Sequence, residues 1–481
     1  MADRPNLLVV MTDQQRADSL GCLGNRAVPT PHLDGLASGG VLFANAWCTN
    51  PICTPSRASF LTGHHLPRHG VETISGVLDP DAVMFPERLR EAGYRTGLVG
   101  KLHAQAGAVE SRERHPHDGF DAYELYYGGG AMMTSPLNAY APWVRERRPG
   151  VFERLVEHEK AAGPIPAEVH MNTWAAERAE AFLDAGGTGG DERPWFLMVS
   201  VFDPHNPYDD HPPEAEARVD ASRLPPLIPP PAPGEVPPGV TRHARDNYFG
   251  DFAEMTPEQV ERMRVGYHAE VGMIDGLVGR LLGTLDARGL AGDTLVLFLS
   301  DHGDLLGDHG LLVKGPVVYD ANLRVPAILR WPRRVEAGRR HAGPVQLNDL
   351  TATLLNAAGV EADLPDAIDP LGPEPREVAV NAYRNSGLGA GHKPHDPPVH
   401  LTCATDGRWT LARYHAAPGT PGTPGTPGNP TPRGTQLFDR ATDPDQLRDL
   451  TEEPAGAEAR ARLDAAVDAF LREEAALRAP C

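Results

Sequence analysis

Polar residues follow four short apolar runs of the chain, at the points where buried strands would end. The runs cover residues 7–11, 96–100, 195–202 and 294–300. The polar residues that follow them are Asp13 with Gln14, Lys101, Asp203 with His205, and Asp301 with His302. In an open α/β sheet the carboxyl ends of the parallel strands form one ligand-binding edge. The sequence therefore predicts a site at that edge in which metal-binding side chains stand beside basic ones.

Cys53 is a candidate reactive residue, because the segment around it is typical of the start of a helix. Pro55 is favoured in a first helical turn, and residues 59–62 can continue the helix. Free N–H groups and the helix dipole at that end favour negative charge, which lowers the pKa of a thiol. A single cysteine is nevertheless more often a buried structural residue. Taken alone, the residue leaves both interpretations open.

The elements around these residues follow an α/β pattern. Helices are predicted over residues 256–289, 346–358 and 457–476, the first from Thr256 as N-cap, Pro257 at the first position and an apolar repeat at helical spacing. Residues 401–413 and 436–439 are predicted as strands of a small sheet, on either side of a Pro/Gly/Thr-rich flexible loop at 418–434. We expect a catalytic domain over 1–369 and, over 370–481, a C-terminal α+β subdomain with an antiparallel sheet and a terminal helix.

Composition limits the possible partners and the location. The chain has 481 residues, with 45 Lys and Arg against 65 Asp and Glu, for a formal net charge of −20. An acidic surface disfavours binding to nucleic acid or to an anionic membrane, so neither partner is expected. The 5 cysteines imply no disulfide framework. The apolar run at residues 6–11 is too short for a secretion signal, which predicts a cytoplasmic protein.

The wider motif around Cys53 resembles the signature of the type I sulfatases, which is Cys-X-Pro-X-Arg followed here by Leu-Thr-Gly at residues 61–63. In that family the cysteine is oxidised after translation to Cα-formylglycine. Further landmarks of the family stand in the right order at residues 6–14, 21–24, 30–34, 93–103, 204–207, 300–303, 307–310, 314–315 and 437–444. The resemblance covers nearly the whole chain. It implies an alkaline-phosphatase-like fold, an α/β architecture with a large, mixed but mostly parallel sheet between helices.

The resemblance also implies a metal site. Asp13, Gln14, Asp301 and His302 would surround one divalent cation, with an oxygen of residue 53 completing the coordination. Oxygen ligands favour Ca²⁺ or Mg²⁺, of which we expect Ca²⁺, and the imidazole makes Mn²⁺ an option. Many family members have a second Asp and an Asn in place of Gln14 and His302. The Gln/His pair resembles the branch that holds phosphonate monoester hydrolases and choline-sulfatase-like enzymes.

Five further residues receive catalytic roles from the resemblance, beside Cys53 itself. Lys101 and Lys314 would clamp the oxygens of the transferring group and offset its charge in the transition state. His103 would act as the base for the second step, and His205 would protonate the leaving oxygen. Arg57 would hold the hydrated aldehyde. One hydroxyl of that hydrate would attack sulfur, and the other would collapse to expel sulfate.

We therefore predict a hydrolase that cleaves a small sulfate monoester into an alcohol and sulfate. A phosphonate monoester or phosphodiester carries the same single charge, so hydrolysis of these esters is the alternative. A non-catalytic binding protein is a third possibility, which the intact set of catalytic residues disfavours. A formylglycine-generating enzyme is the expected partner during maturation, and a homo-oligomer is expected by resemblance.

Overall fold

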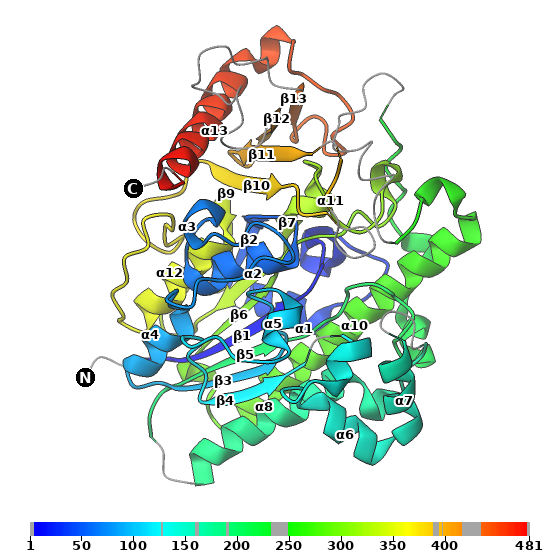
Figure 1. Cartoon of the computed structure of the whole chain (residues 1–481), viewed down its shortest axis with the longest axis vertical. Helices are drawn as coiled ribbons and strands as arrows, with labels where there is room; N and C mark the ends of the chain where they lie inside the picture. Colours follow the sequence, from blue (N-terminus) through cyan, green and yellow to red (C-terminus); the bar gives the residue numbers. More distant parts are fainter. Residues whose placement is uncertain are drawn as a thin grey trace.

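The structure is a computed structural model that describes residues 4–126, 128–158, 163–188, 192–231, 249–387, 394–396, 398–415 and 434–478. A nine-stranded sheet forms its centre (Figure 1). Its strands are β1 (Asn6–Thr12), β2 (Val41–Trp47), β3 (Arg95–Gly100), β4 (Ala122–Leu125), β5 (Trp195–Ser200), β6 (Thr294–Ser300), β7 (Arg324–Val325), β8 (Ala327–Arg330) and β9 (Arg339–Gln346). The order is β4-β3-β5-β1-β6-β8-β2-β7, with β9 also paired to β2. The pairs from β4 to β6 and the pair β2–β9 are parallel, and the others are antiparallel.

Helices cover both faces of this sheet because both faces are apolar. Along β1, Leu7, Val9 and Met11 belong to one core cluster, whereas Leu8 and Val10 belong to the other. Successive side chains of a strand point to opposite faces, so each face needs its own layer of helices. One layer contains α2 (Cys53–Thr62), α4 (Phe85–Glu91) and α12 (Leu347–Ala357), and the other contains α1 (Pro31–Ser38), α8 (Met171–Thr188) and α10 (Pro257–Ala287). The predicted α/β architecture is confirmed.

Within the described ranges, the remaining α-helices are shorter or lie outside these two layers. They are α3 (Leu66–His69), α5 (Gly107–Glu110), α6 (Tyr140–Arg147), α7 (Pro149–Glu157), α11 (Asp320–Leu323) and α13 (Ala457–Leu477). The predicted start of the helix at 256 is confirmed by a capping box, in which Thr256 Oγ1 accepts from Gln259 N at 3.3 Å and Gln259 Oε1 accepts from Thr256 N at 2.8 Å. The other two predicted helices correspond to α12 and α13.

A second sheet of four antiparallel strands lies toward the C-terminus, and α13 packs on it (Figure 1). Its strands are β10 (Ala379–Arg384), β11 (His400–Thr405), β12 (Trp409–His415) and β13 (Gly434–Asp439). The predicted strand region 401–413 is divided by a turn, in which Asp406 Oδ1 accepts from the backbone N–H groups of Arg408 and Trp409, and Gly407 has a φ of +92°. The predicted flexible loop at 418–434 lies outside the described residues apart from Gly434.

The strand order places the four polar strand ends side by side, as the sequence predicted. β3, β5, β1 and β6 are consecutive and parallel. Backbone bonds continue the sheet past these ends, from Lys101 N to Ser200 O at 2.8 Å and from Asp13 N to Asp203 O at 3.2 Å. The residues that follow the strands are thereby held against one another.

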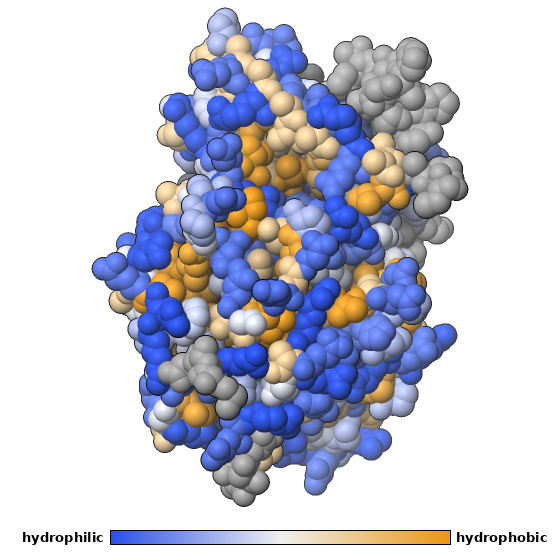
Figure 2. Space-filling view, turned by 90° about the vertical axis from the view of Figure 1, so that its left-hand side faces the viewer, coloured by the Kyte–Doolittle hydropathy of each residue, from blue (hydrophilic) through white to orange (hydrophobic). Residues whose placement is uncertain are grey.

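The outer surface is largely polar on the face seen in Figure 2, where hydrophobic residues lie in separate patches. No helix in the described part of the chain is both long enough and apolar enough to cross a bilayer.

Candidate active site

Four buried side chains converge at the carboxyl edge of the sheet. Asp13 follows β1, Asp301 and His302 follow β6, and Cys53 is the first residue of α2. The ligand atoms of all four lie within 4.8 Å of one another, and each residue is at most 1% exposed. The sulfur of Cys53 stands here for the oxygen that oxidation would place on residue 53. Two carboxylates, an imidazole and an oxygen form a suitable donor set for a divalent cation.

The hydrogen bonding of His302 supports this fit. Its Nδ1 lies 2.9 Å from the carbonyl oxygen of Gly303, so Nδ1 carries the proton and donates it to that oxygen. The lone pair of Nε2 therefore faces the cluster, 3.6 Å from Asp13 Oδ1 and 3.6 Å from Asp301 Oδ1. A backbone carbonyl that fixes the tautomer in this way is the usual outer support of a metal-binding histidine.

Gln14 presents its side-chain oxygen to the same cluster. Its Nε2 donates to Asp304 Oδ2 at 2.7 Å, to Tyr208 Oη at 3.2 Å and to Asn206 Oδ1 at 3.4 Å. The opposite end of the amide, Oε1, accepts from Lys314 Nζ at 2.8 Å. The backbone of Gln14 has a φ of +67°, which an L-residue rarely adopts. This environment leaves only the oxygen as a possible ligand to a cation.

Arg57 and Lys101 neutralise the negative charges of Asp13 and Asp301. Arg57 Nε donates to Asp301 Oδ2 at 2.6 Å, and its Nη2 lies 3.3 Å from Asp13 Oδ2. Lys101 Nζ also contacts Asp13 Oδ2. Burial alone would raise the pKa of Asp13, but the charges of Lys101, Arg57 and Lys314 outweigh it and hold that pKa well below its usual value. Asp13 is therefore ionised and ready to bind a cation.

Lys314 lies against the sulfur of Cys53. Its Nζ is 2.9 Å from Cys53 Sγ and 3.2 Å from His302 Nε2. Burial and the charge of Asp13 act to raise the pKa of the Cys53 thiol, but the charges of Lys314 and Lys101 lower it below its usual value. The predicted position of Cys53 at a helix N-terminus is confirmed, since α2 begins there.

His103 follows β3 and is held beside residue 53. Its Nε2 is 3.1 Å from the hydroxyl of Thr54, and its backbone has a φ of +52°. Glu110 supports this bend, because its carboxylate accepts from His103 N at 2.7 Å and from Ala104 N at 3.2 Å. Burial raises the pKa of Glu110 to about 7. Burial and the charge of Lys101 lower the pKa of His103 well below its usual value, so the ring is neutral.

His205 stands on the loop after β5. Its Nδ1 donates to the carbonyl of Asn206 at 2.9 Å, and its ring packs against Phe202 with centroids 4.6 Å apart. Burial and the charge of Lys314 lower its pKa well below the usual value, so the imidazole is neutral in the free protein. An anion bound beside it would raise this pKa and favour the protonated form.

Comparison with known proteins identifies the family. A family model described as Sulfatase matches residues 5–360. The chain belongs to the sulfatase family. It is thus a sulfuric ester hydrolase, and the family resemblance expected from the motifs is confirmed.

Individual relatives agree with this assignment. The chain is 29% identical over 388 residues to an arylsulfatase of Clostridium perfringens, covering 76% of this chain and 77% of that one. It is 28% identical to a choline-sulfatase of Rhizobium meliloti, covering 99% of this chain and 90% of that one. Its fold is similar to that of a phosphonate monoester hydrolase of Agrobacterium radiobacter, with a TM-score of 0.77, 22% identity and coverage of 98% and 96% of the two chains.

The structure brings the sequence-predicted site residues together. It also reveals three polar residues that the sequence analysis did not identify, namely Asp304, Tyr208 and Glu110. Each acts on another site residue through hydrogen bonds that only the fold creates. Asp304 stands two residues after His302, but nothing in that spacing says that its carboxylate turns toward Gln14.

Proposed function

We propose that this family member hydrolyses small sulfate monoesters through an oxygen nucleophile made from Cys53, releasing an alcohol and sulfate. One observation carries the proposal. Cys53 Sγ lies between the donor set for a cation and a lysine, at 3.8 Å from Asp13 Oδ1, 3.2 Å from His302 Nε2 and 2.9 Å from Lys314 Nζ. A modifiable side chain in this position can meet both a metal ion and the anionic group of an ester.

Two groups would complete the chemistry. One divalent cation, preferably Ca²⁺ with Mn²⁺ or Mg²⁺ as alternatives, would be held by Asp13, Gln14, Asp301, His302 and the oxygen of residue 53. When bound, such a cation lowers the pKa of a hydroxyl that contacts it. Formylglycine at residue 53 would supply, as its hydrate, the attacking hydroxyl and a second hydroxyl for release of sulfate.

The basic residues would bind and orient the ester. Lys101 and Lys314 flank residue 53 and would contact the sulfate oxygens, whose negative charge increases in the transition state. Arg57 donates to the carboxylates of both metal ligands, from Nη2 to Asp13 Oδ2 at 3.3 Å and from Nε to Asp301 Oδ2 at 2.6 Å. These contacts support a role for Arg57 in fixing the two ligands beside residue 53. Because all three cations are buried, little water screens their attraction for an anion.

The two histidines would move protons. His205 would become protonated when the anionic ester binds beside it, and its Nε2 would then donate to the leaving oxygen. His103 Nε2 is hydrogen-bonded to Thr54 beside residue 53, from where it would remove the proton that allows sulfate to leave. The neutral state of both rings in the free protein suits a base in one step and an acid that is charged only with substrate present.

Hydrolysis of phosphonate monoesters or phosphodiesters is the second candidate. The Gln14 and His302 pair favours it, because the pair resembles that branch of the superfamily. A test compares kcat/KM for 4-nitrophenyl sulfate and 4-nitrophenyl phenylphosphonate, after co-expression with a formylglycine-generating enzyme. We expect the larger value for the sulfate and no turnover of either ester by Cys53→Ala. A larger value for the phosphonate would replace the first proposal with the second.

The state of residue 53 can be measured directly. Trypsin releases the peptide from Ala27 to Arg57, which contains Cys48 and Cys53. Conversion of thiol to aldehyde changes the peptide mass, and fragmentation assigns the change to one residue. An unmodified thiol after co-expression would contradict the proposed nucleophile.

The setting of the enzyme is also proposed. We infer a cytoplasmic protein that matures with a formylglycine-generating enzyme and assembles as a homo-oligomer. The net charge of −20 would repel polysulfated polymers and supports a small substrate.

A further inference from the structure

A second group of acidic side chains is buried where the loop after β5 meets α8 and α10. Asp203 and Glu270 are 1% and 0% exposed, and Asp210 is half-buried. Ligand atoms of Asp203, Asp210 and His170 lie within 4.8 Å of one another. The carboxyl groups of Asp210 and Glu270 face each other at hydrogen-bonding range. Asp210 is therefore a direct neighbour of both Asp203 and Glu270.

The protein supplies almost no compensation for their charge. Within the described residues, no N–H or hydroxyl group donates to either carboxylate oxygen of Glu270 or to Oδ1 of Asp210, which have only each other's carboxyl group nearby. Asp203 Oδ2 accepts from Asn172 Nδ2 at 2.7 Å, His170 Nε2 lies 3.9 Å from it, and His211 is a second basic side chain near enough to act on Asp203 electrostatically. Buried carboxylates without a donor must hold protons or a metal cation.

His170 indicates which kind of ligand fits. Its Nδ1 accepts from Asn172 N at 3.2 Å, so the ring proton lies on Nε2 and points toward the carboxylates without reaching an acceptor. The imidazole is thus a neighbour of the cluster and not a metal ligand. The three carboxylates remain as donors, and an all-oxygen set is typical of hard cations such as Ca²⁺, Mg²⁺ or Mn²⁺.

We propose that Asp203, Asp210 and Glu270 bind a second divalent cation, separate from the one at the active site. Without a cation, burial raises the pKa of Asp203 to about 7 and that of Asp210 to about 6, and it holds the pKa of Glu270 well above its usual value. A bound cation would displace these protons and join the loop to α10.

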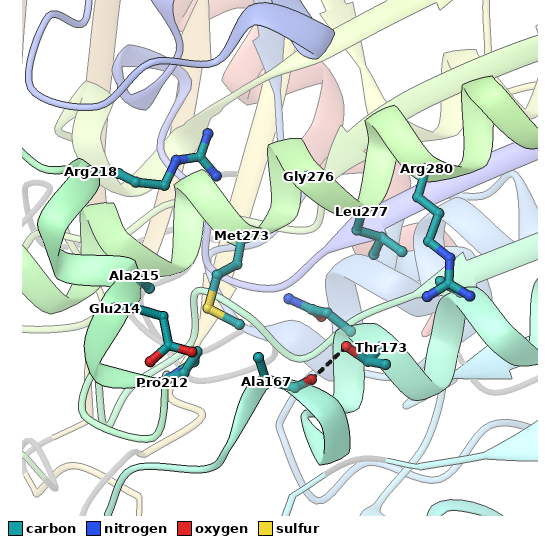
Figure 3. Close-up of a pocket in the computed structure, with 12 residues that line it drawn as sticks. Ala167, Thr173, Pro212, Glu214, Ala215, Arg218, Met273, Gly276, Leu277 and Arg280 are labelled. Atoms are coloured by element: carbon teal, nitrogen blue, oxygen red, sulfur yellow. Dashed lines mark hydrogen bonds between the residues drawn. The ribbon is translucent and has the colours of Figure 1, made fainter.

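A cavity lies next to this cluster. It has a volume of about 320 Å³ and lies between η5 (Pro213–Arg218), the start of α8 and α10 (Figure 3). Asn172, which donates to Asp203, lines it together with Pro212. Figure 3 shows Glu214 on the η5 side and Met273 projecting from α10. Arg218 and Arg280 also line the cavity, so the exposed carboxylate of Glu214 gives its opening no net negative charge.

The location gives the proposed ion a function. Asp203 begins the loop that carries His205, and its carbonyl oxygen accepts from Asp13 N at 3.2 Å. Asp210 ends the same loop, and Glu270 belongs to α10. An ion bound to all three would hold the loop by both ends and keep His205 in place. The second cation is therefore assigned a positioning role.

Counting divalent ions per chain tests the proposal. Wild-type protein, Glu270→Gln and the double variant Asp13→Asn/Asp301→Asn are equilibrated with Ca²⁺, freed of unbound ion by gel filtration and analysed by mass spectrometry of the metal. We expect the ion count to fall from two in wild type to one in each variant. Calcium should also raise the thermal midpoint of Asp13→Asn/Asp301→Asn, and adding Glu270→Gln should abolish that rise.

The competing explanation is that the three carboxyl groups share protons. Glutamine imitates a protonated glutamate in size and charge, so Glu270→Gln should fold under either explanation. An unchanged ion count and an unchanged response of the thermal midpoint to calcium in Glu270→Gln would overturn the proposal. Asp275→Asn is a matched control, because Asp275 is a buried carboxylate that accepts two backbone N–H groups elsewhere on α10. Failure of the active-site cation is distinguishable, since Asp13→Asn/Asp301→Asn would then leave the count unchanged.

Discussion

Replacing Asp304 with asparagine should weaken the active-site metal without removing a ligand. Asp304 Oδ2 accepts from Gln14 Nε2 at 2.7 Å and from Tyr208 Oη at 2.5 Å, and Oδ1 accepts from Leu306 N at 2.9 Å. An asparagine offers one oxygen and one NH₂ group. Whichever way its amide turns, the NH₂ group faces a donor that the carboxylate had satisfied. Rotation of the Gln14 amide would relieve the conflict but turn its NH₂ group toward the cation.

The size of the effect follows from these contacts. A hydrogen bond to an ionised group contributes about 1.5–3 kcal/mol, and Asp304→Asn loses at least one such bond in the orientation that favours the metal. This energy corresponds to a dissociation constant for Ca²⁺ about 10- to 150-fold larger. That range overlaps the roughly 10- to 100-fold losses found when an outer partner of a metal ligand is removed.

Calorimetric titration of metal-free protein with Ca²⁺ measures this dissociation constant. The titration is done in the Glu270→Gln background, so that only the active-site cation is titrated. Activity on 4-nitrophenyl sulfate should recover at saturating Ca²⁺, because the catalytic groups themselves are intact. Asp275→Asn should leave the dissociation constant unchanged. A dissociation constant for Asp304→Asn within about threefold of its parent, or equal weakening by Asp275→Asn, would refute the orienting role of Asp304.

Three further substitutions test other parts of the site. Lys314→Met should lower kcat by roughly 10²- to 10³-fold, since a buried group that stabilises transition-state charge is removed; a change confined to KM would contradict this. His205→Asn should reduce kcat/KM far more for an alkyl sulfate than for 4-nitrophenyl sulfate, because the nitrophenolate leaving group needs little protonation. Equal losses for the two esters would exclude His205 as the general acid. The raised pKa of Glu110, about 7 against 4.5, means that the folded state binds its proton more tightly. The wild-type free energy of unfolding should therefore fall relative to Glu110→Gln by about 3 kcal/mol between pH 4 and pH 8, measured by urea titration, and parallel pH profiles would contradict this.

The convergence of the site could be predicted because it depends on strand order and chain direction. Asp13, Lys101, His205 and Asp301 each follow a buried apolar run, and parallel strands bring such ends to one edge whatever the detailed packing. Cys53 was predictable for a similar local reason, since the turn after Ile52 exposes the first N–H groups of α2.

The orientation of the side chains could not be predicted in this way. The Gln14 amide is turned by groups 190 or more residues away in the chain, at separations of 192, 194 and 290 residues. No local pattern contains that information. The turn at Gly407 was missed because residues 401–413 read as continuous β-forming sequence, although Asp406 and Gly407 carried a turn signal. β10 was missed because Ala379–Arg384 alternates weakly and depends on β11 for its pairing.

The loop from Asp203 to Asp210 connects the buried acidic cluster to the active site. Its first and last residues, Asp203 and Asp210, belong to the buried acidic cluster. The residues between them contact the active site: His205 lies beside the two lysines, and Asn206 and Tyr208 accept from the amide of Gln14. A change at either end should therefore act on both the proposed acid and the proposed metal ligand. Asp210→Asn should lower activity toward alkyl sulfates and weaken active-site Ca²⁺ together, by similar factors. Loss of one property without the other would show that the loop does not move as a unit, and the link between the two clusters would be refuted.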